Sequence, residues 1–247
     1  MKIVVAGATG LIGSRTVARL RDHGVEAVPV SRGHGVDLIT GRGLDEALRG
    51  AEVVVDVTDA PARTEDAALR FFRTASANLL AAAASAGVEH HVVVSMVGAE
   101  RLRSGYFRAK LLQEEQVRHS PIPHSIVRAA LSFEFVEAMA LADAHGDGVH
   151  VVPALVQPVA TGDIATALAH VAVGLPLFDV LEAAGPEEYR LDDLTAKLLA
   201  ARGDTRNVVA DARAGLLGAN VPDERMLLPA PEAHICHTTF GMWLGER

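Results

Sequence analysis

The chain has 247 residues, enough for one large domain or for one domain with a small lobe. Hydrophobic residues make up 49% of it and charged residues 22%, which excludes a chain that is disordered throughout. The 31 acidic residues outnumber the 23 Lys and Arg residues, and the net charge of -8 repels a phosphate backbone, so no nucleic-acid partner is expected.

Short apolar runs alternate with longer segments of helical period along the chain. Up to residue 128, strands are predicted at 2–6, 25–30, 36–38, 53–57, 91–95 and 125–128, and helices at 11–23, 45–49, 64–86 and 106–119. Beyond residue 128, helices are predicted at 133–144, 164–173 and 191–201, and strands at 149–152 and 179–183. This alternation predicts an α/β fold with a Rossmann-type, doubly wound parallel sheet and a small C-terminal substrate-binding lobe.

Three glycines follow the first predicted strand, in the segment VVAGATGLIGS. Gly7, Gly10 and Gly13 lie at a strand-to-helix turn, where backbone N–H groups and the helix dipole can hold a pyrophosphate. No Lys follows Gly13, which excludes a P-loop. The same loop adds Thr9, Leu11 and Ile12 as candidate dinucleotide contacts.

The residues that follow the second predicted strand bear on the choice of dinucleotide. An acidic residue there selects NAD, whereas a cation with a small polar neighbour accommodates a 2′-phosphate, and this chain has Ser31 and Arg32. We therefore predict NADP(H) as the cofactor. Asp37 is a further candidate contact, beside the adenine, and Val57 and Thr58 are others, at the end of the 53–57 strand.

Tyr106 and Lys110 are four residues apart on a predicted helix, so their side chains share one face. Ser95 ends the 91–95 strand, at the same sheet edge as the glycine loop. A Tyr hydroxyl exchanges protons near neutral pH when a neighbouring cation stabilises its phenolate, and a Ser hydroxyl can orient a carbonyl. We predict that Tyr106, Lys110 and Ser95 are catalytic and that Lys110 also contacts the cofactor.

Five segments together resemble a known family. They are GATGLIG at 7–13, VVVSMVGAE at 92–100, YFRAK at 106–110, LVQPVATGDIA at 155–165 and EAAGPEEYRLDDL at 182–194. The chain resembles an atypical short-chain dehydrogenase/reductase of the NmrA-like group. The resemblance implies a Rossmann fold, use of NADP(H), and an active constellation of Ser95, Tyr106 and Lys110. We accordingly expect residues 1–128 to form the NAD(P)-binding core and residues 129–247 to form a substrate-side lobe that completes the sheet, in one compact unit.

Three functions fit these observations. The first is an NADPH-dependent oxidoreductase that reduces a carbonyl or quinone of a small to medium apolar substrate, with Tyr106 as proton donor. The second, which the resemblance implies, is a regulatory protein that senses NADP(H) without chemistry. The third is an enzyme of the same fold that acts without net cofactor turnover, as an epimerase, a dehydratase or a coupling enzyme. The oligomeric state stays open.

The single cysteine, Cys236, cannot form an internal disulfide, which favours a reducing compartment. The apolar run at 3–6 meets glycines too soon for an export signal, and no apolar stretch is long enough to span a bilayer. We expect a cytoplasmic protein with no membrane partner. His234, Cys236 and His237 do not have the spacing of a metal site, so no metal is expected.

Overall fold

Seven parallel strands form the central sheet in the computed structural model, which describes residues 1–142 and 148–246. Their order across the sheet is β11-β8-β5-β4-β3-β1-β2. The bounds are β1 Lys2–Ala6, β2 Glu26–Val30, β3 Val53–Asp56, β4 His90–Met96, β5 His124–Ala129, β8 Val180–Ala184 and β11 His234–Ile235. The direction of strand succession reverses between β1 and β3, and ligands of such sheets bind outside the carboxyl ends of the strands at this point.

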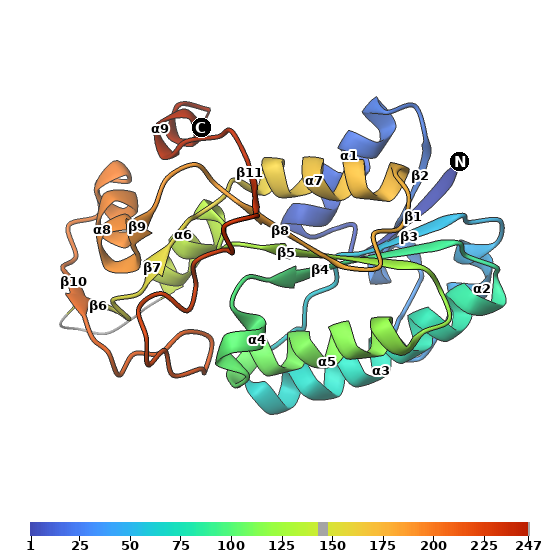
Figure 1. Cartoon of the computed structure of the whole chain (residues 1–247), viewed down its shortest axis with the longest axis horizontal. Coiled ribbons are helices and arrows are strands. Elements are labelled where there is room, and N and C mark those ends of the chain that lie inside the picture. The colour runs from blue at the N-terminus through green and yellow to red at the C-terminus, as the bar shows by residue number, and fades with distance from the viewer. Residues whose placement is uncertain (143–147, 247) are drawn as a thin grey trace.

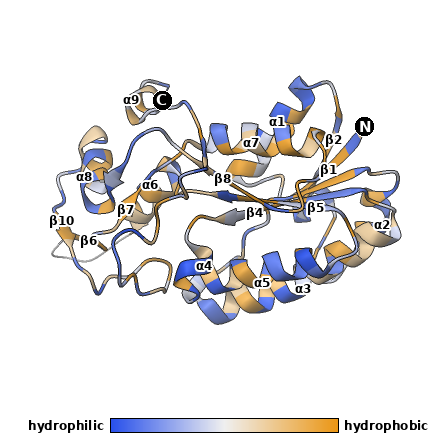
Figure 2. Cartoon of the chain, in the orientation of Figure 1, coloured by the Kyte–Doolittle hydropathy of each residue, from blue (hydrophilic) through white to orange (hydrophobic). Residues whose placement is uncertain are grey.

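Helices cover both faces of this sheet (Figure 1). One layer contains α1 Leu11–Asp22 and α7 Thr161–Val173, and the other contains α2 Leu44–Leu48, α3 Glu65–Ser85 and α5 Gly105–His119. Alternate residues of each strand enter the two layers: Val5 and Val55 pack with α1 and α7, whereas Val4 and Val54 pack with α3 and α5. Hydrophobic residues therefore run along the central strands (Figure 2), as in a sheet that is buried on both faces.

A smaller lobe lies beside the carboxyl end of the sheet (Figure 1). It contains α6 Phe133–Ala142, α8 Leu191–Ala201, and two small sheets formed by β6 Val149–Val151 with β10 Val208–Ala210 and by β7 Leu155–Val156 with β9 Tyr189–Arg190. Its own core includes Phe133, Leu194, Leu198 and Trp243, the last from α9 Phe240–Gly245. The residues after 128 thus supply both this lobe and two strands of the central sheet.

The predicted fold class is confirmed, because a parallel sheet with helices on both faces is observed. The strand predicted at 36–38 is wrong, since these residues lie in an irregular segment between the short 3-10 helix η1 Arg32–His34 and a turn at 38–40. Gly35 has a left-handed backbone, and the Asp37 carboxylate accepts a hydrogen bond from the Ile39 N–H, so local turn chemistry overrides the apolar pattern.

Several elements are too short to leave a periodic signal in the sequence, among them β7, β9, β11 and α4 Ala99–Leu102. The predicted helix at 133–144 is observed up to Ala142, and its last two residues lie outside the described ranges. None of the helices in the described ranges is long and apolar enough to cross a membrane.

Substitution of Gly13 by Ala is expected to destabilise the fold, because a Cβ there would overlap the Gly7 carbonyl oxygen, which is backbone and cannot move aside. We expect a loss of about 2 kcal/mol in the free energy of unfolding, measured by chemical denaturation. Gly162→Ala is the matched control, since Gly162 is also in the first turn of a helix and an added methyl group would have nothing within 4 Å of it. An equal effect of the two substitutions would contradict this close packing.

Candidate active site

The glycine loop brings two pieces of backbone into contact at the end of β1. Gly7 has a φ of +85°, and a Cβ on it would lie 2.8 Å from the Val57 carbonyl oxygen, so only glycine fits there. Gly10 caps α1 without any side-chain hydrogen bond to the first turn. The first N–H groups of α1 therefore have no capping side chain as an acceptor. Helix ends that bind anions have the same feature.

A cavity of about 660 Å³ lies along this loop. Eight of the predicted cofactor contacts line it: Gly7, Thr9, Gly10, Ser31, Arg32, Asp37, Val57 and Thr58. Leu11 and Gly13 line neither this cavity nor the next one, because Leu11 is exposed on α1 and Gly13 packs against the Gly7 backbone. Val36, Leu38 and Phe71 add apolar surface to the cavity.

Ser31 and Arg32 line this first cavity and directly follow β2. Arg32 is exposed in η1, and within the described ranges no carboxylate forms an ion pair with it. Ser31 shares a hydrogen bond of 2.8 Å with the His34 ring nitrogen Nδ1. Asp37 lies at the same cavity with its pKa lowered, mainly by the hydrogen bond from the Ile39 N–H.

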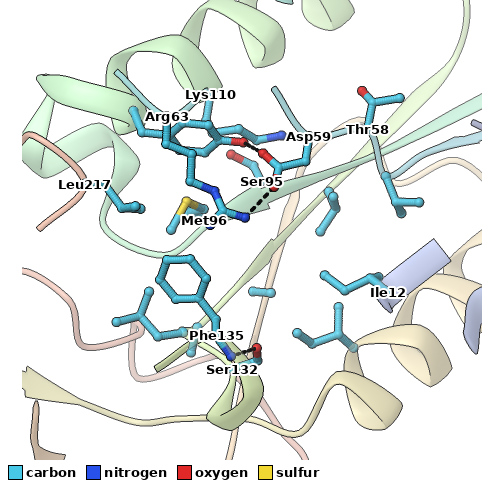
Figure 3. A pocket seen from close by; sticks show the side chains of 17 residues that line it. Ile12, Thr58, Asp59, Arg63, Ser95, Met96, Lys110, Ser132, Phe135 and Leu217 are labelled. Carbon is cyan, nitrogen blue, oxygen red and sulfur yellow. Dashed lines mark hydrogen bonds and ion pairs between the residues drawn. The ribbon is translucent and has the colours of Figure 1, made fainter. Parts of the chain in front are cut away.

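A second cavity, of about 150 Å³, adjoins the first and shares Val57, Thr58 and Asp59 with it. Figure 3 shows the second cavity. Tyr106, Lys110, Ser95 and Ile12 all line it, so the structure brings the predicted catalytic residues to one space beside the cofactor groove. Most of its remaining lining is apolar, including Val94, Met96, Leu131, Phe135, Ile164 and Leu217.

The Tyr106 hydroxyl donates a hydrogen bond of 2.6 Å to Asp59 Oδ1, and Asp59 Oδ2 pairs with Arg63 Nη2 at 2.5 Å. Tyr106 is 5% exposed. Burial and the Asp59 charge raise the pKa of the Tyr106 hydroxyl well above its ordinary value, while Arg63 opposes the shift. Tyr106 is therefore held in its protonated form.

Lys110 belongs to a different group of polar side chains. Its ammonium donates to Gln113 Oε1, and Gln113 Nε2 donates to Asp56 Oδ2 at 2.8 Å. The ammonium also lies 4.6 Å from the centre of the Phe72 ring. Burial lowers the pKa of Lys110 to about 8, against the attraction of Asp56 and other carboxylates.

We expected Lys110 to lower the pKa of Tyr106, and this expectation is wrong for the described arrangement. The hydroxyl of Tyr106 is directed to Asp59, and the cation that favours its phenolate is Arg63. Lys110 is satisfied instead by Gln113, one helical turn further along α5.

Ser95 is buried near the end of β4 and lines the second cavity (Figure 3). Glu114 lies behind Ser95. Burial alone would raise the pKa of the Glu114 carboxyl, but the hydrogen bonds and charge of Arg128 outweigh burial, so the pKa is lowered. Arg128 binds both Glu114 carboxylate oxygens, at 2.9 and 2.8 Å, and also pairs with Glu100 at 2.7 Å. These ion pairs tie the end of β5 to α5 and to α4.

Four polar residues of the site were not predicted from the sequence: Asp56, Asp59, Arg63 and Gln113. The VVVD ending of β3 and the TDAPAR segment after it carried a signal, since polar residues after a buried strand lie at the ligand edge of a parallel sheet. Within the described ranges no group of three or more His, Cys, Asp or Glu side chains is placed to hold a metal ion.

Comparison with known proteins adds one curated relative. The (4-alkanoyl-5-oxo-2,5-dihydrofuran-3-yl)methyl phosphate reductase of Streptomyces griseus is 34% identical over 140 residues. The match covers 51% of this chain and 46% of the reductase, so the chain spans about half the length of that relative.

Solved structures share the fold. An NADPH-dependent quinone oxidoreductase from Escherichia coli superposes with a TM-score of 0.62 at 21% identity, covering 86% of this chain and 78% of that one. MoeE5, solved in complex with UDP-glucose and NAD, superposes with a TM-score of 0.74 at 17% identity, covering 99% of this chain and 96% of that one.

The sequence profile of an NAD(P)H-binding family matches residues 7–172, from the glycine loop to the last turn of α7. This match extends over more than half of the chain and includes the residues that build both cavities up to Ile164. The chain therefore belongs to the NAD(P)H-binding family.

Proposed function

We propose that this protein is an NADPH-dependent reductase that transfers hydride to a carbonyl, quinone or related unsaturated compound. The observation that carries the proposal is the pair of adjoining cavities, in which a protonated Tyr106 lines a mostly apolar space next to the cavity of the glycine loop. We also infer a small-molecule substrate, and a cytoplasmic setting on the ground of the single cysteine.

The residues of the first cavity fit a dinucleotide. Gly7 and Gly13 leave no room for a Cβ, so the loop backbone can approach a pyrophosphate, and the uncapped first turn of α1 offers N–H donors to it. Arg32 would pair with a 2′-phosphate, since no carboxylate in the described ranges neutralises it. When bound, NADPH would supply the hydride.

Tyr106 would give its proton to the substrate oxygen. Asp59 accepts a hydrogen bond from the hydroxyl, which keeps it protonated. The O–H would turn from Asp59 to the substrate oxygen before the proton is transferred. Lys110 would place an ammonium at the wall of the cavity, held there by Gln113, and so contact the cofactor ribose. Ser95 would orient the reacting carbonyl from the end of β4.

The state of Tyr106 favours reduction over the other two functions. An epimerase or dehydratase that begins by removing a proton from an alcohol needs the phenolate, which is the form of Tyr106 that burial and the Asp59 charge disfavour. A sensor needs the glycine loop and Arg32 but has no use for a buried, oriented proton donor. The curated reductase relative and the quinone oxidoreductase of like fold support the same choice.

Tyr106→Phe is expected to lower kcat with NADPH and a panel of quinones and enones by about 10²- to 10⁴-fold, because the proton donor is lost while the ring is kept. The Kd for NADPH, measured by calorimetry, should stay within about twofold of wild type, because the ring that remains still fills the cavity wall. Tyr189→Phe, a change of the chain's other tyrosine outside both cavities, is the control. Full activity of the Tyr106 variant would eliminate the proposed proton transfer.

Arg32→Ala is expected to weaken NADPH binding by about tenfold and to leave NADH binding unchanged, because only NADPH carries the 2′-phosphate. Thermal shift across a series of cofactor concentrations measures both affinities. Arg19→Ala, on the exposed side of α1, is the matched control. Equal stabilisation of the wild type by NADH and NADPH would remove the argument for NADP(H).

Stability should depend on pH through Lys110. Its folded-state pKa lies below the ordinary value, so between about pH 8 and pH 10 the unfolded chain binds more protons than the folded one, and stability rises with pH. The difference in unfolding free energy between wild type and Lys110→Met should therefore shift in favour of wild type as pH rises from about 8 to about 10. A pH-independent difference would mean that Lys110 is not buried as described.

A further inference from the structure

Three charged side chains line the second cavity: Asp59, Arg63 and Lys110. Lys110 is fully buried and donates to Gln113, and its charge is balanced by Asp56 and Asp59. Both carboxylate oxygens of Asp59 are engaged, one by Tyr106 and the other by Arg63. Of the two cations of this cavity, Lys110 is proposed above to contact the cofactor ribose, and Arg63 keeps hydrogen-bonding capacity for a substrate.

The guanidinium of Arg63 is held at two points. Its Nη2 atom lies 2.5 Å from Asp59 Oδ2, and its central carbon lies 4.9 Å from the centre of the Phe135 ring. In the ranges that the structure describes, its Nε and Nη1 atoms have no hydrogen-bond acceptor within the protein. The side chain is 45% exposed, and Figure 3 shows it reaching between Asp59 and Phe135.

The surroundings of this guanidinium are mostly apolar. Met96 and Leu217 lie on the same side of the cavity as Arg63 in Figure 3, and Ile12 lies opposite them. Ile164 also lines the cavity. A ligand that fills the cavity would therefore place an apolar body against these side chains and meet a cation at one end. Arginine binds carboxylate and phosphate groups through paired N–H donors, more strongly where water is displaced.

We infer that Arg63 binds an anionic group of the substrate, so that the substrate is a reducible compound with an apolar body and a carboxylate or phosphate at one end. This inference rests on the proposed function, because it names the substrate class of the same site. Asp59 holds the guanidinium in position before the substrate enters and competes with the incoming anion for it.

The cofactor is a less suitable partner for Arg63. The first cavity, along the glycine loop, is lined by Asp59 and Pro61 from the loop after β3, but not by Arg63. Arg63 lines the second cavity, on the far side of Asp59 from the glycine loop, and Arg32 already provides a cation within the first one.

The test measures binding and needs no turnover. Phenylacetate, phenyl phosphate and the neutral phenylacetamide are titrated into the intact protein by calorimetry, for wild type, Arg63→Ala, Asp59→Asn and Arg108→Ala. Arg108 is the matched control, since it is an exposed arginine paired with Glu65 and lines neither cavity. The glycine loop is unchanged in all four proteins, so the difference between wild type and Arg63→Ala isolates the Arg63 site.

Wild type and Arg108→Ala should bind at least one of the anions about tenfold more tightly than phenylacetamide, and Arg63→Ala should lose this preference. Asp59→Asn should bind the anions more tightly than wild type, because the competing carboxylate is gone. The tighter of phenylacetate and phenyl phosphate identifies the carboxylate or the phosphate as the recognised group. Circular dichroism checks that each variant is folded.

The inference is overturned if Arg63→Ala keeps the preference for anions, or if wild type binds neither anion more tightly than the amide. It is also overturned if Arg63→Ala weakens NADPH binding while anion binding stays the same, because Arg63 would then serve the cofactor. A failure of the proposed function would give a different result. Wild type would then oxidise NADPH with no compound of the carbonyl and quinone panel, while its Arg63-dependent binding of anions would remain.

Discussion

The site depends on the contact between the first turn of α1 and the ends of β1 and β3. Gly7 lies against the Val57 carbonyl, and Gly13 lies against the Gly7 carbonyl, so helix and strands meet through backbone alone. This contact points the N-terminus of α1 at the carboxyl edge of the sheet and leaves the loop that follows β3 beside it. Val57, Thr58 and Asp59 of that loop then border both cavities, which is why the two spaces adjoin each other.

Two residues one turn apart on α5 serve two separate polar groups. Tyr106 is bonded to Asp59 in the loop after β3, and Lys110 is bonded through Gln113 to Asp56 at the end of β3. A buried charge and a buried hydroxyl are each costly without partners, and here each has its own acceptor. The separation lets the phenol stay protonated while the ammonium remains available to a bound ligand.

The alternation of strands and helices, the glycine loop and the shared face of Tyr106 and Lys110 could be predicted because each is a local pattern of a few residues. The strand at 36–38 was predicted wrongly because the backbone turns at Gly35 outweigh two apolar residues. The bond from Tyr106 to Asp59 joins residues 47 positions apart, and the second of them lies in an irregular loop, so no periodicity indicates it. Arg63 was missed for the same reason.

The order of the strands in the sheet has a consequence for biosynthesis. β8 pairs with β5 although α6, β6 and β7 of the lobe come between them in the chain, and β11 pairs with β8 although β9, α8 and β10 come between those two. While a ribosome is still making the segments between them, the edge of β5 carries unpaired backbone groups beside an apolar strand, and such edges join foreign strands readily. The edge of β5 gains its partner only once residues 180–184 have been made, and β8 gains its own only once Ile235 has followed, so the sheet is completed late in synthesis.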